Sequence, residues 1–159
     1  MSEVPVGWFY VQCPSRQDQV LTVSSMSMKS SIRVELRPKK KIGVTNNHQL
    51  WCYNQGYLVN KHSGCGKKKK KKKKLKRNRL LIIFGIVLGV EKDKLKGQFI
   101  FQSKKVDGDA KKQVWKYDEE KRLVLTGDDT PYALNDLAVP KLDSIENGCS
   151  WVLCPVEQT

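Results

Sequence analysis

Histidines are few in this chain, and the side chains that often carry catalysis or bind metals do not have the spacing of such sites. There are 2 histidines among 159 residues, and His48 and His62 have no cysteine or carboxylate at metal-site spacing. No nucleophile elbow, phosphate-binding glycine loop or catalytic acid pair occurs. Asp107 and Asp109 flank Gly108, but the rest of a calcium loop is missing, so they indicate a turn. We predict no enzyme activity, metal or cofactor.

The cysteines are expected to be free thiols. Their number is odd, no Cys-x-x-Cys pair occurs, and Pro5 and Gly7 interrupt the first ten residues, which lack a signal-peptide pattern. Cys65 precedes the lysine run, whose cations would lower its thiol pKa if the segment were ordered; the alternative is an ordinary reduced cysteine. We expect a cytoplasmic protein. The five are Cys13, Cys52, Cys65, Cys149 and Cys154.

A lysine run supplies most of the net charge. The chain carries +14, and eleven of these charges lie within residues 67–79, which leaves +3 for the rest. Such a segment would bind nucleic acid, heparin-like chains or anionic membranes with strong salt dependence. Alternatively, it is a low-complexity insertion or a gene-model error without a partner. The candidate polyanion-binding residues are Lys67, Lys70, Lys74, Lys76, Arg77 and Arg79.

An apolar segment at 80–90, with the sequence LLIIFGIVLGV, follows the lysine run. As a helix, eleven residues would rise only about 16 Å, against the roughly 30 Å of a bilayer core. The segment therefore favours a buried strand or strand pair, although the basic run before it leaves contact with a membrane surface open.

Short strands are expected throughout, because β-branched and aromatic residues recur between turn-forming residues and no helical periodicity is sustained. About a dozen such strands predict an all-β barrel or sandwich. The clearest segments are 8–11, 20–23, 32–36, 50–53, 57–59, 82–88, 99–101, 114–117, 122–125, 132–134 and 151–153.

An internal repeat organises these strands. Gln-x-Trp-x-Tyr occurs at 49–53 and again at 113–117, each time after a strand and a basic turn. A third, eroded copy keeps Asn147 four residues before Trp151 but lacks the glutamine. Cutting after each motif gives units of about 1–53, 54–117 and 118–159, and the middle unit is longer because it contains the lysine run.

Three units of about four strands, each closing on Gln-x-Trp, resemble the ricin-B-type lectins over nearly the whole chain except 65–90. The resemblance implies one β-trefoil domain, 1–159, of three four-stranded repeats, with a Lys-rich insertion in the second repeat and a basic loop at 66–79. It also implies that the motif side chains are structural, the indoles in a shared core and the amides bracing turns. These are Gln49, Trp51, Gln113, Trp115 and Trp151.

In that family a sugar site combines an aspartate before a loop, an aromatic ring on the following strand and an amide near the motif. In the first repeat Thr22, Arg37 and His48 stand at these positions, which predicts a lost site. In the second, Gly66 and the lysine run stand where the aspartate strand is expected, so its carboxylate is missing.

The third repeat retains the best candidates, since Asn135 stands in the aspartate position, Asp136 is next to it and Asn147 is near the amide position. Turn formation by these residues is the alternative. The resemblance therefore implies a monomeric, non-catalytic carbohydrate-binding module with degenerate sites. The alternative function is a polyanion- or membrane-surface adaptor that uses 67–79.

Overall fold

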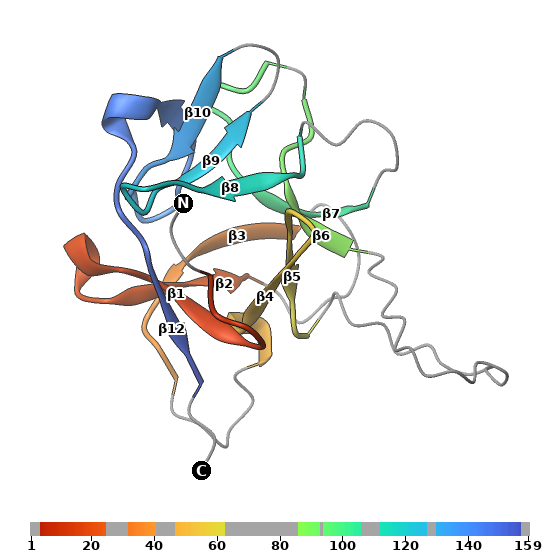
Figure 1. The fold of residues 1–159 in the computed structure, drawn as a ribbon, viewed down its shortest axis with the longest axis vertical. Coiled ribbons are helices and arrows are strands. Elements are labelled where there is room, and N and C mark those ends of the chain that lie inside the picture. Colours follow the sequence, from red (N-terminus) through yellow and green to blue (C-terminus); the bar gives the residue numbers. More distant parts are fainter. Residues whose placement is uncertain are drawn as a thin grey trace, which may run out of the picture.

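The computed structural model describes residues 4–24, 32–40, 47–62, 86–92, 94–105, 112–126 and 130–156. These residues form twelve β-strands and three 3₁₀ turns, and no α-helix lies among them (Figure 1). The strands are β1 (Phe9–Cys13), β2 (Gln19–Val23), β3 (Ile32–Arg37), β4 (Trp51–Asn54), β5 (Tyr57–Asn60), β6 (Ile86–Gly89), β7 (Phe101–Lys104), β8 (Trp115–Tyr117), β9 (Leu123–Thr126), β10 (Pro131–Leu134), β11 (Leu142–Ser144) and β12 (Val152–Pro155). The 3₁₀ turns are η1 (Pro14–Arg16), η2 (Asn47–Gln49) and η3 (Ile145–Asn147).

The strands fall into three consecutive units of four. In each unit the second and third strands form an antiparallel pair, β2 with β3, β6 with β7 and β10 with β11. Strand β4 pairs with β5, and β8 pairs with β9. Strand β1 pairs with β12, so the first and last strands lie side by side (Figure 1).

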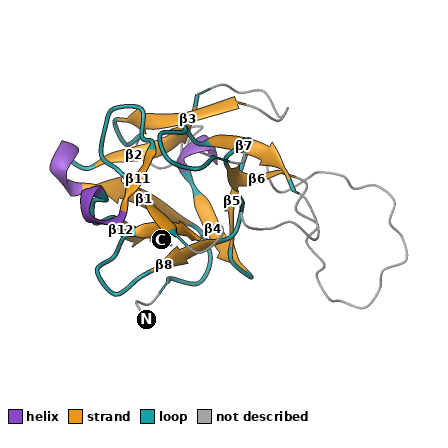
Figure 2. Cartoon of the chain, turned by 90° about the horizontal axis from the view of Figure 1, so that it is seen from above, coloured by secondary structure: helices purple, strands orange, loops and turns teal. Residues whose placement is uncertain are grey.

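Two sheets result from this pairing. One contains β1 to β7 and β12, and the other contains β8 to β11. Hydrogen bonds outside the ladders also join the units: the amide of Trp115 donates to the oxygen of Gly56 at 2.7 Å, and the amide of Trp151 donates to Lys121 at 2.8 Å. Figure 2 shows the strands surrounding a common interior when seen from above.

A two-residue turn connects β4 to β5. Gln55 and Gly56 both have positive φ, 52° and 91°, between the paired residues Asn54 and Tyr57. This is the backbone of a type I′ hairpin turn, for which glycine at the second position is favoured. The turn sets the β4–β5 register immediately after the first Gln-x-Trp motif.

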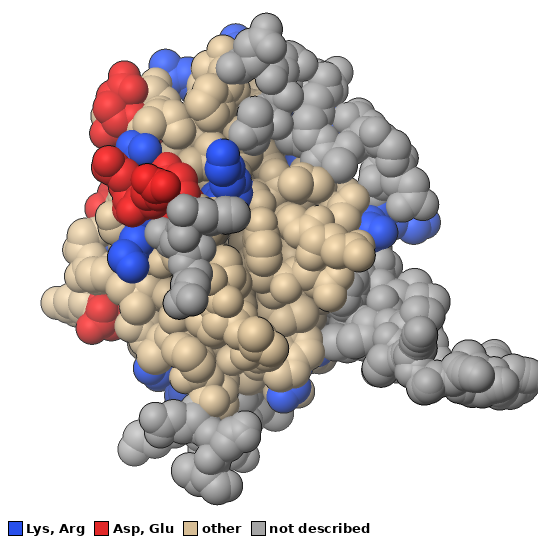
Figure 3. All heavy atoms as spheres, viewed as in Figure 1, with Lys and Arg blue, Asp and Glu red and all other residues tan. Residues whose placement is uncertain are grey.

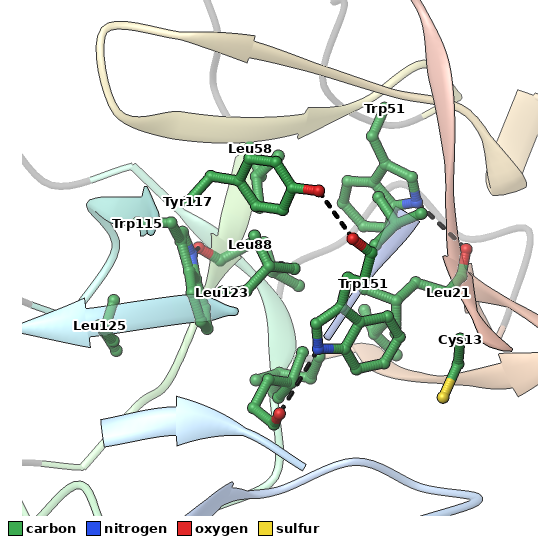
Figure 4. Packing of buried hydrophobic residues seen from close by; sticks show 14 of the residues in the cluster. Cys13, Leu21, Trp51, Leu58, Leu88, Trp115, Tyr117, Leu123, Leu125 and Trp151 are labelled. Atoms are coloured by element: carbon green, nitrogen blue, oxygen red, sulfur yellow. Dashed lines mark hydrogen bonds between the residues drawn. The ribbon is translucent and has the colours of Figure 1, made fainter. Parts of the chain in front are cut away.

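The interior is one cluster of buried apolar side chains that all three units supply. Trp51, Trp115 and Trp151 lie within it and are at most 1% exposed. Figure 4 shows their indoles converging with leucines from β2, β5, β6 and β9. Residues that lie far apart in the sequence therefore share one core, and removal of this apolar area from water is the main source of stability.

The middle unit corrects one expectation from the sequence. The strand before the hairpin loop was expected at the position of Gly66 and the lysine run, but it lies further along the chain as β6, which overlaps the strand predicted at 82–88 and pairs with β7 from Ile86↔Lys104 to Gly89↔Phe101. This strand is the second half of the apolar segment 80–90, and Val90 after it is buried too. The basic loop 66–79 and residues 80–85 lie outside the described residues. Among those described, no helix has the length and apolarity to cross a membrane.

Candidate functional site

Three indole hydrogen bonds identify equivalent positions in the three units. The Nε1 atoms donate to backbone carbonyl oxygens: Trp51 to Leu21 at 3.1 Å, Trp115 to Leu88 at 2.9 Å and Trp151 to Leu134 at 3.4 Å. Figure 4 draws the bonds of Trp51 and Trp151. Each acceptor is on the strand before the hairpin loop. The residue that follows it, Thr22, Gly89 or Asn135, therefore stands at the position where the lectin resemblance expects a sugar-binding aspartate.

In the third repeat Asn135 organises the loop between β10 and β11. Its Oδ1 accepts hydrogen bonds from the amides of Lys141 at 2.9 Å and Leu137 at 3.4 Å. Only 8% of the residue is exposed, and its Nδ2 lies 3.5 Å from Oδ2 of Asp143. Asn135 thus uses its oxygen for the turn and directs its amide nitrogen toward a carboxylate.

Asp143 on β11 joins two of the residues expected at the site. Its Oδ1 accepts from the amide of Ser144 at 2.7 Å and from Nδ2 of Asn147 at 3.3 Å. These donors, the Ser144 amide first, hold the pKa of the Asp143 carboxyl below its usual range. Asn147, at the end of η3, is exposed. We call Asn135, Asp143 and Asn147 the third-repeat polar cluster.

Asp136 is placed differently from Asn135 and Asn147. Its Oδ2 accepts a hydrogen bond from Oγ of Ser15 at 2.6 Å, and its backbone oxygen accepts one from Nε of Arg16. Both partners belong to η1 in the first repeat. The structure therefore brings Asn135 and Asn147 to Asp143 and sets Asp136 against η1.

The sequence interpretation missed Asp143. A signal was present, because Glu35-Leu36-Arg37 and Lys141-Leu142-Asp143 align when their leucines are matched. The strand pairs Leu21↔Leu36 and Leu134↔Leu142 show that the matched leucines also occupy equivalent positions in the structure. The register Leu88↔Gln102 places Ser103 at the same position in the second repeat. Arg37, Ser103 and Asp143 are therefore equivalent, and they stand where the lectin resemblance expects an aromatic ring.

In the first repeat, two of the three equivalent side chains bond to other residues of the same repeat. Thr22 is buried, donates through Oγ1 to the oxygen of Val20 at 3.0 Å and accepts from Nε2 of Gln49 at 3.2 Å. Arg37 is paired with Glu35 at 2.9 Å. His48 is buried, and its Nδ1 has no hydrogen-bond partner. Thr22 therefore stands where a sugar-binding aspartate is expected, and it offers no carboxylate to a sugar.

In the second repeat the backbone fills the space that a carboxylate would need. A Cβ atom added at Gly89 would lie 2.6 Å from the carbonyl oxygen of Lys112 and 2.9 Å from Cγ of Gln113. The amide of Val90 donates to the same Lys112 oxygen at 3.1 Å. Glycine is therefore required at this position by close approach of another backbone segment.

The motif glutamines bind the backbone at the end of the third strand of their own units or just beyond it. Gln49 donates through Nε2 to the oxygen of Pro38 at 2.9 Å and accepts from the amide of Lys40 at 2.8 Å. Gln113 donates through Nε2 to the oxygen of Lys104 at 2.7 Å. In the third repeat Cys149 stands at this position.

Solved structures with the same arrangement supply the comparison. The mdaA-1 domain superposes with a TM-score of 0.67 at 20% identity, over 97% of this chain and 93% of that domain. The Vibrio vulnificus hemolysin/cytolysin β-trefoil lectin, with N-acetyl-D-lactosamine bound, gives 0.64 at 15% identity, over 96% of each chain. The C-half of an earthworm R-type lectin, in complex with GalNAc, gives 0.59 at 13% identity, over 92% of this chain and 97% of that one.

The fold is that of the β-trefoil lectins. The expected all-β trefoil of three four-stranded repeats is therefore confirmed. No protein-family model matches the sequence, and no curated protein matches it either. The likeness is thus one of structure.

Charge is unevenly distributed over the trefoil surface. Figure 3 shows acidic side chains gathered on the side where η3 lies in Figure 1, while Lys and Arg are scattered around the rim.

In the first repeat, burial of His48 lowers its pKa, and Lys40, His62 and Arg37 lower it further. The first and third repeats therefore offer different electrostatic environments at equivalent positions.

Two further expectations concern metals and the lysine run. In the described part of the chain, no group of three or more His, Cys, Asp or Glu side chains could hold a metal ion. The candidate polyanion-binding residues Lys67, Lys70, Lys74, Lys76, Arg77 and Arg79 lie outside that part.

Proposed function

We propose that this trefoil is a non-catalytic carbohydrate-binding module whose sugar site is the third-repeat polar cluster. The observation that carries the proposal is the Asp143 carboxylate, ionised and flanked by the amides of Asn135 and Asn147. Two structural neighbours were solved with glycans bound, N-acetyl-D-lactosamine in one and GalNAc in the other. In the first repeat Thr22 and Arg37 bond within their own repeat, and in the second repeat there is no space for a side chain at Gly89, so one site per chain is proposed.

The chemistry of the cluster suits hydroxyl recognition. A carboxylate accepts hydrogen bonds from two neighbouring hydroxyls, while a side-chain amide both donates and accepts. Asp143 uses one oxygen for Ser144 and Asn147, and each carboxylate oxygen has more than one lone pair available. Since Asp143 replaces the family's aromatic ring, binding would rest on hydrogen bonds, and we expect a dissociation constant on the order of 1 mM.

A glycan array followed by titration with the best ligand tests the proposal. Asp143→Asn keeps the size of the side chain and removes its charge, so binding should fall at least about tenfold, equivalent to about 1.4 kcal/mol for one charge-assisted hydrogen bond. Glu35→Gln makes the same change on β3 and should leave binding unaltered. If Asp136→Asn loses glycan binding while Asp143→Asn keeps it, the sugar site is at Asp136 instead. A folded chain that binds no glycan would overturn the proposal.

The alternative function is a polyanion- or membrane-surface adaptor. It is supported by the concentration of eleven of the chain's net +14 charges within 67–79, together with free thiols that favour a cytoplasmic location. Retention on heparin at two salt concentrations, with and without 67–79, separates it from the lectin. Retention that depends on 67–79 and falls steeply with salt supports the adaptor, whereas equal retention of the deletion variant contradicts it.

A further inference from the structure

Two cysteines from opposite ends of the chain meet where the first and third repeats adjoin. Cys13 ends β1 and is fully buried, while Cys149 lies between η3 and β12 and is partly exposed. Their Sγ atoms are 4.0 Å apart, although 136 positions separate the residues. Because β1 and β12 are paired directly, from Phe9↔Pro155 to Gln12↔Val152, the backbone holds the two thiols near one another.

Polar groups around Cys13 connect this pair to η1. Oγ of Ser15 lies 3.3 Å from Sγ of Cys13 and donates to Oδ2 of Asp136 at 2.6 Å. Arg16 donates through Nε to the backbone oxygen of Asp136. Ser15 therefore links the Cys13 thiol to the Asp136 carboxylate.

The two thiols differ in acidity. The hydrogen bond from Cys149 lowers the pKa of Cys13 to about 6, against the opposing effects of burial and of the Asp136 charge, and Ser15 assists. The same hydrogen bond, with burial, raises the pKa of Cys149. Cys13 is therefore the more acidic thiol of the pair, and thiolate is the nucleophilic form in disulfide exchange.

We propose that Cys13 and Cys149 are a redox-active dithiol, which a small-molecule disulfide such as oxidised glutathione closes into a disulfide bond between the first and third repeats. A disulfide requires about 2.05 Å between the sulfurs. The present Sγ–Sγ separation of 4.0 Å must therefore shorten by about 2 Å when the bond forms. This proposal does not depend on sugar binding.

The exchange has two balanced steps. The proton of Cys149 first passes to the Cys13 thiolate, and the Cys149 thiolate, which solvent can reach, attacks oxidised glutathione; a mixed disulfide forms and one glutathione thiolate leaves. That glutathione thiolate takes the proton from Cys13, and the Cys13 thiolate then attacks Sγ of Cys149, so that the second glutathione thiolate leaves. Two protein thiols are oxidised, and one glutathione disulfide is reduced to two glutathiones.

Oxidation would link the segment between η3 and β12, which follows Asn147 of the polar cluster, covalently to β1. The amide of Cys149 donates to the oxygen of Leu134 at 3.2 Å, next to Asn135, and Asn147 lies two residues before Cys149. A covalent bond from Cys149 to β1 would restrict local opening of this segment. It would also restrict the unfolded chain across most of its length, which stabilises the folded state.

The test uses the full chain in oxidised and reduced glutathione buffers, with thiol counting and peptide mass spectrometry. We expect the thiols to fall from the 5 in the sequence by two, a linked Cys13–Cys149 peptide that is lighter by two hydrogens, and a higher urea midpoint in the oxidised monomer. Cys149→Ser should abolish all three changes, and Cys13→Ser should stop the reaction at a glutathione adduct on Cys149.

A matched control replaces Cys52 and Cys154, both partly exposed, by serine and should keep the linked peptide. Non-reducing electrophoresis separates an intramolecular bond from a link between chains. If Cys13→Ser unfolds the chain, Cys149→Ser alone still decides the outcome. Absence of the linked peptide from folded chains after equilibration with oxidised glutathione, or its replacement by a link to another cysteine, overturns the proposal.

Discussion

The hydroxyl of Tyr117 donates a hydrogen bond to the backbone oxygen of Trp151 at 2.7 Å, within the core. Tyr53 makes the same bond to the oxygen of Trp115 at 2.6 Å, so each of the first two repeats is tied to the motif tryptophan of the next. The corresponding position in the third repeat, two residues after its tryptophan, is Leu153, which has no hydroxyl. Figure 4 shows the Tyr117 bond beside the three indoles.

Tyr117→Phe should lower the free energy of unfolding by about 1–2 kcal/mol, because it leaves a buried carbonyl oxygen without this donor and keeps the packed ring. Tyr132→Phe is the matched control, since Tyr132 is partly buried and its hydroxyl makes no hydrogen bond within the described part of the chain. It should change stability by under about 0.5 kcal/mol. Urea denaturation measures both. Equal effects of the two substitutions would show that the Tyr117 bond contributes nothing net.

The repeat motif was sufficient to predict the fold from the sequence. Two copies of Gln-x-Trp with similar strands around them predicted three units, and a trefoil is the arrangement in which three such units share one core. The eroded third copy was still recognisable because Trp151 occupies the core like the others. Large side chains that must fill a common interior leave a periodic signal that loop residues do not.

The candidate site was only partly predictable. Asn135 and Asn147 were singled out, but their common partner Asp143 depends on strand register, which sequence spacing alone did not provide. Asp136 was chosen because it is adjacent to Asn135, and adjacent residues point different ways at the end of a strand. The Cys13–Cys149 contact joins residues that are far apart in the sequence, and no local sequence pattern predicts it.

Gly89→Ala should destabilise the fold by about 1–3 kcal/mol, because the new Cβ would meet a backbone oxygen that cannot move aside without disturbing the Val90–Lys112 hydrogen bond. Gly89→Asp should cost at least as much and should not create a sugar site. Ser103→Ala, on the same hairpin, removes a buried hydroxyl without a partner and should be near neutral. A stable Gly89→Asp chain would disprove the steric account of the lost second site.

His48 should make the fold sensitive to mild acid. Burial lowers its pKa in the folded state, so the unfolded chain binds this proton more readily and acid favours unfolding. The stability that His48 contributes is complete above its unfolded pKa of about 6.5 and is lost as pH falls through the lower folded pKa.

The measurement is the melting temperature of wild type and His48→Gln between pH 7.5 and pH 5. We expect the wild type to lose more stability across this range than the variant, in which the titrating group is absent. His62→Gln removes the other histidine and should keep most of the wild-type pH dependence. Parallel curves for wild type and His48→Gln would contradict the assignment.

Replacing each motif tryptophan by phenylalanine should rank the three repeats. Trp51, Trp115 and Trp151 are buried to the same extent, so the lost volume is similar and the indole hydrogen bond makes the difference. Those bonds measure 2.9 Å for Trp115, 3.1 Å for Trp51 and 3.4 Å for Trp151. A bond at 3.4 Å lies beyond the usual N–H···O range and contributes less.

Each substitution should cost about 1–4 kcal/mol in urea denaturation, with Trp115→Phe the most costly and Trp151→Phe the least. Trp8→Phe, which changes a partly buried ring outside the main core cluster, controls for loss of an indole as such. The order matters because the third repeat has also lost its motif glutamine, and a weaker indole bond there would mean that its hairpin is held less firmly. If Trp151→Phe proves as costly as Trp115→Phe, the third hairpin is anchored as strongly as the second.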